Sequence, residues 1–208
     1  MKKKSVLAVV LSLCLVAVVA IGATLALLSD KTNTVTNRFT VSQKGIDIDL
    51  KEPAWYGIDF GATEAENPDD PALGINLAED IVPGREIPKD PTVKNTGNHD
   101  AWVAIELEYL KDGAAAAFAD IAAQADINFD ATNWTEKAGS NKTVFYYNVP
   151  LAVDAETKTA LFDTVTINEE LEEVFAFDIK ITAYAVQAEG VADLAAAQTE
   201  LDALIAAN

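Results

Sequence analysis

The sequence contains very few of the residues on which redox and metal chemistry usually depend. Among 208 residues it has one cysteine, Cys14, and one histidine, His99. One cysteine cannot form a disulfide within the chain, so stability must come from packing and backbone pairing. Catalytic zinc sites usually draw on two or three histidines or on cysteine and histidine together, and no His-Glu-x-x-His or Gly-x-Ser-x-Gly motif is present. We therefore expect no enzyme, no metal site and no cofactor.

Basic residues are also scarce. Lysine and arginine number 15 against 33 aspartates and glutamates, which gives a net charge of −18. Nucleic-acid binding needs a basic surface, so this balance argues against a nucleic-acid partner, and it disfavours adsorption to anionic lipid for the same reason. Self-repulsion that keeps the chain soluble accounts for the acidity. Binding of divalent cations between associated subunits is the alternative that charge alone leaves open.

The N-terminal residues have the order of a secretory signal. Lys2–Lys4 form a positive region, an uncharged apolar run extends over Val6–Leu28, and small residues stand at Thr24 and Ala26. This pattern predicts a signal peptide over residues 1–26 that a signal peptidase removes. Contact with the membrane is then expected only before cleavage. Removal takes away three lysines and no acids, so the net charge falls from −18 to −21.

Three other interpretations of the apolar run compete with this cleavage. The apolar run is 23 residues long, and about 20 suffice to span a bilayer, so an uncleaved signal anchor is one of them. A lipoprotein signal at Cys14 is disfavoured because bulky Leu13 precedes it, and a pilin-type leader lacks a cleavage site before the apolar run. The small residues favour cleavage between Ala26 and Leu27, which also removes the only cysteine.

The remaining chain has the composition of short strands. Residues 27–43 are rich in threonine and contain no proline or glycine, and residues 46–51 alternate apolar and polar side chains. We expect an antiparallel hairpin between strands at 92–94 and 103–109, around the turn at 95–98. Other strands are expected at 75–82, 127–134, 142–149, 159–167 and 174–187, with Phe175, Phe177, Ile179, Ile181 and Ala183 on one face of the last.

Two helices accompany these strands. The alanine-rich residues 113–126 predict an inserted helix whose inner contacts are Phe118 and Ile121. Residues 191–208 have leucine and isoleucine at helical spacing and predict a C-terminal amphipathic helix. The strand pattern predicts a mainly β fold, either a sandwich or a barrel.

Several motifs, taken in order, resemble those of the TasA/camelysin family. They are the Gly22-x-Thr24-x-Ala26 junction with Leu27-Leu28-Ser29-Asp30 after it, Asn37–Val41, Val82–Gly84, Lys89–Gly97, Ala101–Val103, and Ile181–Ala188, the last typical of the clostridial branch. Members of this family are biofilm-matrix proteins of Gram-positive bacteria, processed by the signal peptidase SipW. The resemblance implies a secreted protein of the cell surface or extracellular matrix, with a SipW-like signal peptidase as a partner.

The resemblance also implies a fold and an assembly. It implies a jelly-roll-like antiparallel β-sandwich over residues 44–190 that self-associates into fibres by donor-strand addition. The mature N-terminal arm, residues 27–43, would fill a strand position in a neighbouring subunit, because a sheet edge offers unpaired backbone groups. The arm residues expected to carry this contact are Leu27, Leu28, Val35, Phe39 and Val41.

Other interpretations of the same residues stay open. Residues 27–43 can instead fold back as a strand of their own domain. Camelysin relatives have been described as metallopeptidases, although one histidine is poor support for that chemistry. A monomeric adhesin or sugar-binding module that uses its loops is the third possibility. Trp55, Trp102 and Trp134 are its candidate carbohydrate platform, although Trp102 is expected in the core and the Trp55-Tyr56 pair at the surface. A calcium-loop spacing at residues 126–130 lacks the glycine and glutamate that such a loop needs.

The signal and the arm together yield a prediction about assembly. While the apolar segment stays attached, residues 27–30 are held at the membrane and cannot enter a neighbouring subunit. Ala26→Asp should block cleavage, leave the downstream domain folded and abolish fibres, as measured by electron microscopy of the cell surface. Fibres built from uncleaved protein would contradict this prediction.

Overall fold

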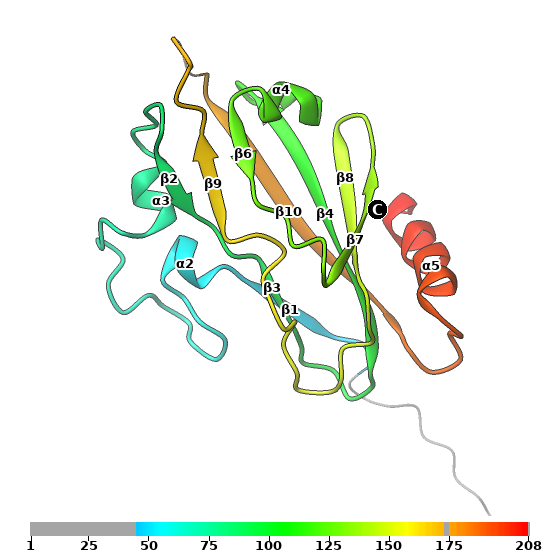
Figure 1. Cartoon of the computed structure of the whole chain (residues 1–208). Helices are drawn as coiled ribbons and strands as arrows, with labels where there is room; N and C mark the ends of the chain where they lie inside the picture. Colours follow the sequence, from blue (N-terminus) through cyan, green and yellow to red (C-terminus); the bar gives the residue numbers. More distant parts are fainter. Residues whose placement is uncertain (1–44, 173–174, 208) are drawn as a thin grey trace, which may run out of the picture. The chain divides into compact units, whose positions relative to one another are not determined.

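The computed structural model describes residues 45–172 and 175–207, and these form a mainly β structure with antiparallel sheets (Figure 1). The described part contains ten strands and four helices. The predicted signal peptide, the cleavage site between Ala26 and Leu27, and the arm residues Leu28, Val35, Phe39 and Val41 lie outside the described residues.

The larger sheet is organised around one long strand pair. Strand β4 (Ala101–Lys111) pairs with β10 (Phe177–Gln187) over their full lengths, from Ala101 opposite Gln187 to Lys111 opposite Phe177. On its other side β4 pairs with β8 (Lys142–Tyr147), and β8 pairs with β7 (Trp134–Ala138). The short β5 (Ala114–Ala115) adds to the end of β4. The sheet order is therefore β10-β4-β8-β7, with β10 at one edge.

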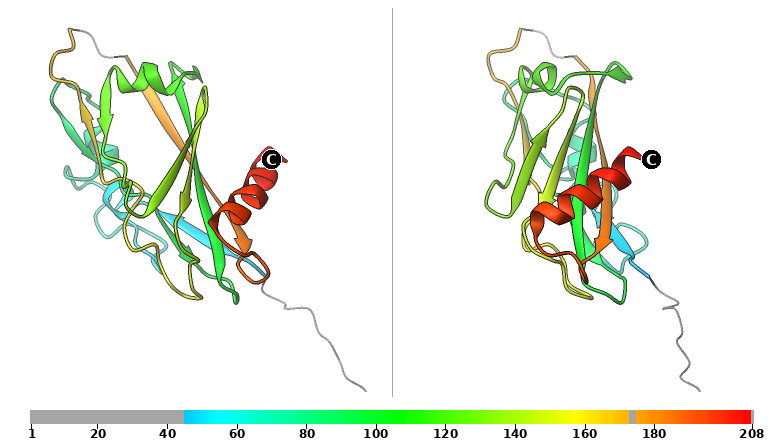
Figure 2. Two further views of the ribbon diagram at one scale, coloured as in Figure 1. Left: turned by 45° about the vertical axis from the view of Figure 1, so that its right-hand side comes forward. Right: turned by 90° about the vertical axis from the view of Figure 1, so that its right-hand side faces the viewer.

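A second layer faces this sheet. It contains β2 (Glu86–Pro88), β9 (Thr164–Ile167) and β6 (Ala125–Ile127) in the order β2-β9-β6, together with the pair β1 (Ile48–Lys51) and β3 (Thr92–Asn95). Buried side chains from both layers form one apolar core, and Figure 2 shows the two layers from the side. The prediction of an antiparallel β-sandwich is confirmed, whereas the jelly-roll connectivity stays a prediction.

Strand β4 contributes several of the fully buried side chains of the core. Its inward side chains Val103, Ile105, Leu107 and Tyr109 are all 0% exposed. Across the core, Phe129 packs on aromatic neighbours from both layers, with ring centroids 4.6 Å from Phe145 and 5.5 Å from Phe162. Alternation of apolar residues along β4, visible in the sequence, therefore does correspond to a buried face.

The C-terminal helix is also confirmed. Helix α5 (Leu194–Ala206) packs on the outer face of the larger sheet, where Ala197 and Leu201 are buried against Trp102 and Tyr146 (Figure 2). Its first turn is capped by Asp193, whose carboxylate accepts a hydrogen bond from the backbone N–H of Ala196 at 2.9 Å. The outer face of β4 is thus covered by α5, as the inner face is covered by the second layer.

Several predicted elements are shorter than expected, and the strand predicted over 159–167 is confined to β9 at its end. Within residues 113–126 only α4 (Phe118–Ala122) is helical, and β5 and β6 occupy the two ends, because pairing with β4 and β9 outweighs the helix propensity of alanine. Ile121 is fully buried, as expected. The strand predicted over 127–134 ends at Ile127, because the Asp130 carboxylate accepts hydrogen bonds from the N–H groups of residues 132 and 133 and closes a turn.

Two further predictions were wrong. Residues 92–95 do not form a hairpin with β4 but pair with β1, since the buried Asn95 amide bonds to the carbonyl groups of His99 and Leu151 and directs the chain into the other layer. The strand expected over 75–82 is replaced by the helical turn α3 (Gly74–Leu77). The side-chain amide of Asn76 donates there to carbonyl groups of the preceding loop.

We expect α5 to contribute substantially to stability through Leu201. Leu201→Ala leaves a cavity against a fully enclosed site and should lower the free energy of unfolding by about 2–5 kcal/mol, measured by chemical denaturation. Glu200→Ala, on the exposed side of the same helix, is the control and should change it by less than about 0.5 kcal/mol. Equal effects of the two substitutions would show that the helix is not packed as described.

Candidate functional site at the open edge of the sandwich

Strand β10 lies at an edge of the larger sheet, and both its free backbone edge and its inward side chains are incompletely covered. Within the described part of the chain it pairs with β4 alone, so its other edge has no strand partner there. Its inward side chains Phe177, Ile179 and Ile181 are half-buried, whereas those of β4 beside them are fully buried. An edge strand presents a row of backbone N–H and C=O groups to any further strand. The sandwich is therefore incomplete along β10.

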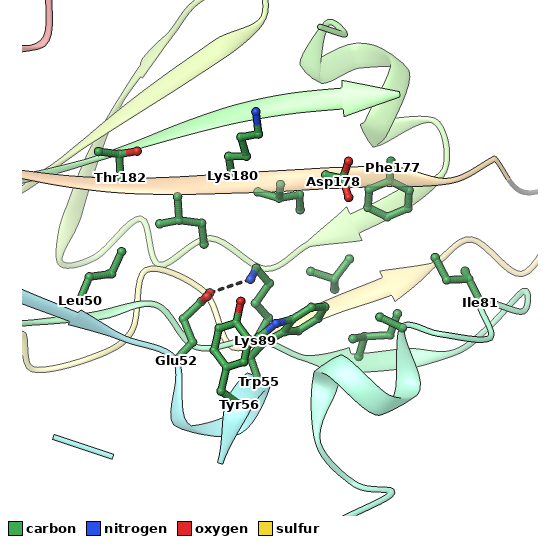
Figure 3. Close-up of a pocket in the computed structure, with 15 residues that line it drawn as sticks. Leu50, Glu52, Trp55, Tyr56, Ile81, Lys89, Phe177, Asp178, Lys180 and Thr182 are labelled. Atoms are coloured by element: carbon green, nitrogen blue, oxygen red, sulfur yellow. Dashed lines mark ion pairs between the residues drawn. The ribbon is translucent and has the colours of Figure 1, made fainter. Parts of the chain in front are cut away.

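A groove of about 790 Å³ runs beside this edge. Its opposite wall is mostly apolar and comes from β1, the α3 region, β2 and β9. Figure 3 shows Lys180 and Thr182 extending to the side of β10 away from the Glu52–Lys89 pair, so β10 presents its apolar face to that pair. The apolar residues of the opposite wall are Leu50, Ala78, Ile81, Ile87 and Val165.

A buried ion pair lies in this otherwise apolar groove. Lys89 Nζ is 2.7 Å from Glu52 Oε1, and the two side chains are only 8% and 11% exposed. Glu52 continues the inward series of Ile48 and Leu50, one residue beyond β1. Lys89 follows Ile87 in the same way, one residue beyond β2. Each charge therefore occupies a position that the alternation of its strand turns toward the core.

A short helix holds an aromatic ring over the lysine. Lys89 Nζ is 4.2 Å from the centre of the Trp55 ring, a cation–π contact. Trp55 lies in α2 (Pro53–Tyr56), whose Ala54 N–H donates to Asp90 Oδ1 at 2.8 Å. Gly74 makes room for this arrangement, because a Cβ there would lie 2.0 Å from the Pro88 carbonyl oxygen and 2.6 Å from the Trp55 ring.

The charges of this site are not balanced. Burial raises the pKa of Asp90, and the nearby negative charge of Glu52 adds to the shift, while the hydrogen bond from Ala54 opposes it. Glu52 and Asp90 thus repel one another, and of the two only Glu52 forms an ion pair with Lys89. The contact of Lys89 with Glu52 Oε1 is close but poorly directed, so that oxygen has no hydrogen-bond partner among the described residues.

The other residues singled out from the sequence lie elsewhere. Trp102 and Trp134 are 6% and 2% exposed, so the prediction that Trp102 belongs to the core is confirmed. Tyr56 is 47% exposed, beside the groove. His99 lies in a loop, where its carbonyl accepts a hydrogen bond from the amide of Asn95. Among the described residues no three histidine, cysteine or acidic side chains cluster as metal ligands.

The residues with calcium-loop spacing serve the loops instead. The Asn128 side chain bonds to the Asp163 side chain and to the backbone of residues 163 and 164. Hydrogen bonds from the Thr159 hydroxyl and the Asn133 amide lower the pKa of Asp130 to about 2. Asp130 is thereby committed to its own turn, and these side chains form no site with the groove.

The sequence interpretation missed the Glu52–Lys89 pair. Its signal was present as a charged residue that interrupts an alternating apolar series, at Ile48-x-Leu50-x-Glu52 and again at Ile87-x-Lys89. Alternation alone indicates that such a residue faces inward. It does not indicate that two such residues from separate strands meet, which only the packing of the second layer decides.

In comparisons with known proteins, no family model, curated protein or solved structure matches the chain. The fold and the groove define it as an antiparallel β-sandwich with a groove beside the free edge of β10. The resemblance drawn from the sequence motifs therefore stays a prediction. In the part of the chain that the structure describes, none of the helices has the length and apolar character needed to cross a bilayer.

Removal of only one charge of the Glu52–Lys89 pair should destabilise the folded protein. Lys89→Met leaves a buried carboxylate without its counter-charge and should lower the free energy of unfolding by about 3–5 kcal/mol, and adding Glu52→Gln should recover much of this loss. Lys94→Met, at the more exposed 3.0 Å pair with Glu156, is the control and should cost less than about 1 kcal/mol. Equal losses in the two single variants would show that the groove pair is solvated like a surface pair.

Proposed function

We propose that this chain is a secreted structural subunit that polymerises by strand addition at the cell surface or in an extracellular matrix. Residues 27–43 of one copy enter the groove of the next copy and pair with the free edge of β10. The observation that carries this proposal is the incomplete cover of β10, whose inward apolar face is half-buried beside an open groove. An added strand supplies both the missing backbone partner and the missing apolar side chains.

The arm has the length and the pattern of a suitable strand. At about 3.3 Å per residue, its 17 residues span roughly 55 Å, which exceeds the span of about 36 Å for the 11 residues of β10. Val35, Phe39 and Val41 fall on one face of an extended chain, because successive side chains alternate. That face matches the apolar walls of the groove.

The rest of the sequence supports the same role. A secretory signal places the mature chain outside the cytoplasm, and strand addition needs neither disulfides nor a bound cofactor. The net charge of −21 after signal removal keeps free subunits soluble until the arm and groove meet. On this proposal the protein is not an enzyme, and its partners are other copies of itself and the signal peptidase that releases the arm.

Electron microscopy of two secreted lengths tests the proposal. The chain 27–208 should form filaments, whereas the chain 42–208 should stay monomeric. Ile179→Asp in the longer chain should reduce filaments at least tenfold, because a carboxylate would have to be buried against the incoming strand. Lys180→Asp places the same residue on the opposite face of β10 and should leave filaments intact.

Mixing the variants identifies the two halves of the contact. The 42–208 chain can only accept an arm and the Ile179→Asp chain can only donate one, so together they should give dimers and no filaments. Filaments from both lengths, or monomers from both, would contradict strand addition. Metal-dependent proteolysis by the purified protein would favour the peptidase alternative.

A further inference from the structure

We propose that the Glu52–Lys89 pair fixes the register of the incoming strand by binding the side-chain amide of Asn37 from the neighbouring copy. This inference rests on the proposed function, and it names the residue contact that specifies how far the arm enters the groove. It depends on three features: the unsatisfied state of the ion pair, the repeating character of the groove wall, and the single polar position on the apolar face of residues 35–41 of the arm.

The ion pair has hydrogen-bonding capacity left over. A lysine ammonium has three N–H donors, and within the described residues Lys89 Nζ contacts only Glu52 Oε1 and the face of Trp55. Glu52 Oε1 has no well-directed hydrogen bond there. An apolar strand laid over the pair would remove its remaining contact with water without replacing it, which is costly for buried charges. A strand with a polar side chain at this point avoids that cost.

The remainder of the groove does not specify a register. On β10 the apolar side chains Phe177, Ile179 and Ile181 repeat at steps of two residues. A strand that slips by two residues keeps the same face inward and meets similar apolar neighbours. The Glu52–Lys89 pair is the one described ion pair among the groove-lining residues, so it distinguishes one register from the others.

Residues 35–41, the apolar part of the arm, carry one matching position. Their inward face reads Val35, Asn37, Phe39 and Val41, with one polar residue between apolar ones. An amide can accept a hydrogen bond from Lys89 and donate one to Glu52 at the same time. A slip of two residues in either direction would place Val35 or Phe39 on the ion pair. A buried asparagine fixes register in coiled coils by the same physical reasoning.

Disulfide mapping measures the register directly. The full chain is expressed with Cys14→Ala, so that every thiol is an introduced one, and secreted protein is oxidised after assembly. One copy carries Ile179→Cys, and a second carries Val35→Cys, Phe39→Cys or Val41→Cys. With the native Asn37, one arm position should account for most of the cross-linked dimer. Asn37→Val should raise the yield at a neighbouring position at least fivefold, to a level similar to the first.

Two controls separate register from general effects on the arm. Thr36→Val makes a comparable polar-to-apolar change on the opposite face of the arm and should leave the distribution of cross-links unchanged. In the accepting copy, Glu52→Gln with Lys89→Met removes both charges. The native arm should then also cross-link at more than one position, and Asn37→Val should cause no further spread.

The outcomes distinguish this inference from the proposed function. One dominant cross-link that persists with Asn37→Val, even at a lower yield, would overturn the role of Asn37 in register while strand addition stands. Absence of a cross-link between copies at all three positions with the native arm would overturn strand addition itself. In a chain that carries both Ile179→Cys and one arm cysteine, cross-links confined to single copies, separated by size on a denaturing gel, would show that the arm fills its own groove and would contradict both.

Discussion

The full-length pairing of β4 with β10 is the constraint on which the rest of this structure depends. It places β4 at the centre of the larger sheet, where its inner face is covered by the second layer and its outer face by α5. The same pairing leaves β10 at the edge, with one side bonded and the other open. Because an apolar edge strand attracts further strands, the feature that builds the core also creates the candidate site.

The groove combines two kinds of surface with different consequences. Its apolar walls favour burial of any extended apolar segment, since burial of such side chains stabilises association without regard to their order. The Glu52–Lys89 pair makes the binding of most such segments less favourable, because its charges lose contact with water and gain no new partner. Attraction from the walls and selectivity from the ion pair together suit a strand of defined pattern better than a small apolar ligand.

Much of the sandwich could be predicted from the sequence, because period-two alternation directly reports which residues share a face. It identified β1, β4 and β10 and the face of β10 that carries Phe177, Ile179 and Ile181. It failed where a side chain outside the strand decides the path of the backbone. Asn95 sends β3 to β1 in place of β4, and Asp130 ends a strand at residue 127 by closing a turn.

The sequence by itself determined the acidic and cysteine-poor composition and the alternating strands that make a β-sandwich, since each follows from the residues alone or from the pattern of close neighbours. Only the tertiary structure decided which strand lies at the edge and that Glu52 and Lys89 meet beneath Trp55. Those facts depend on contacts between segments about 35 residues or more apart. A one-dimensional pattern says which way a side chain faces, but the packing of layers decides what it faces.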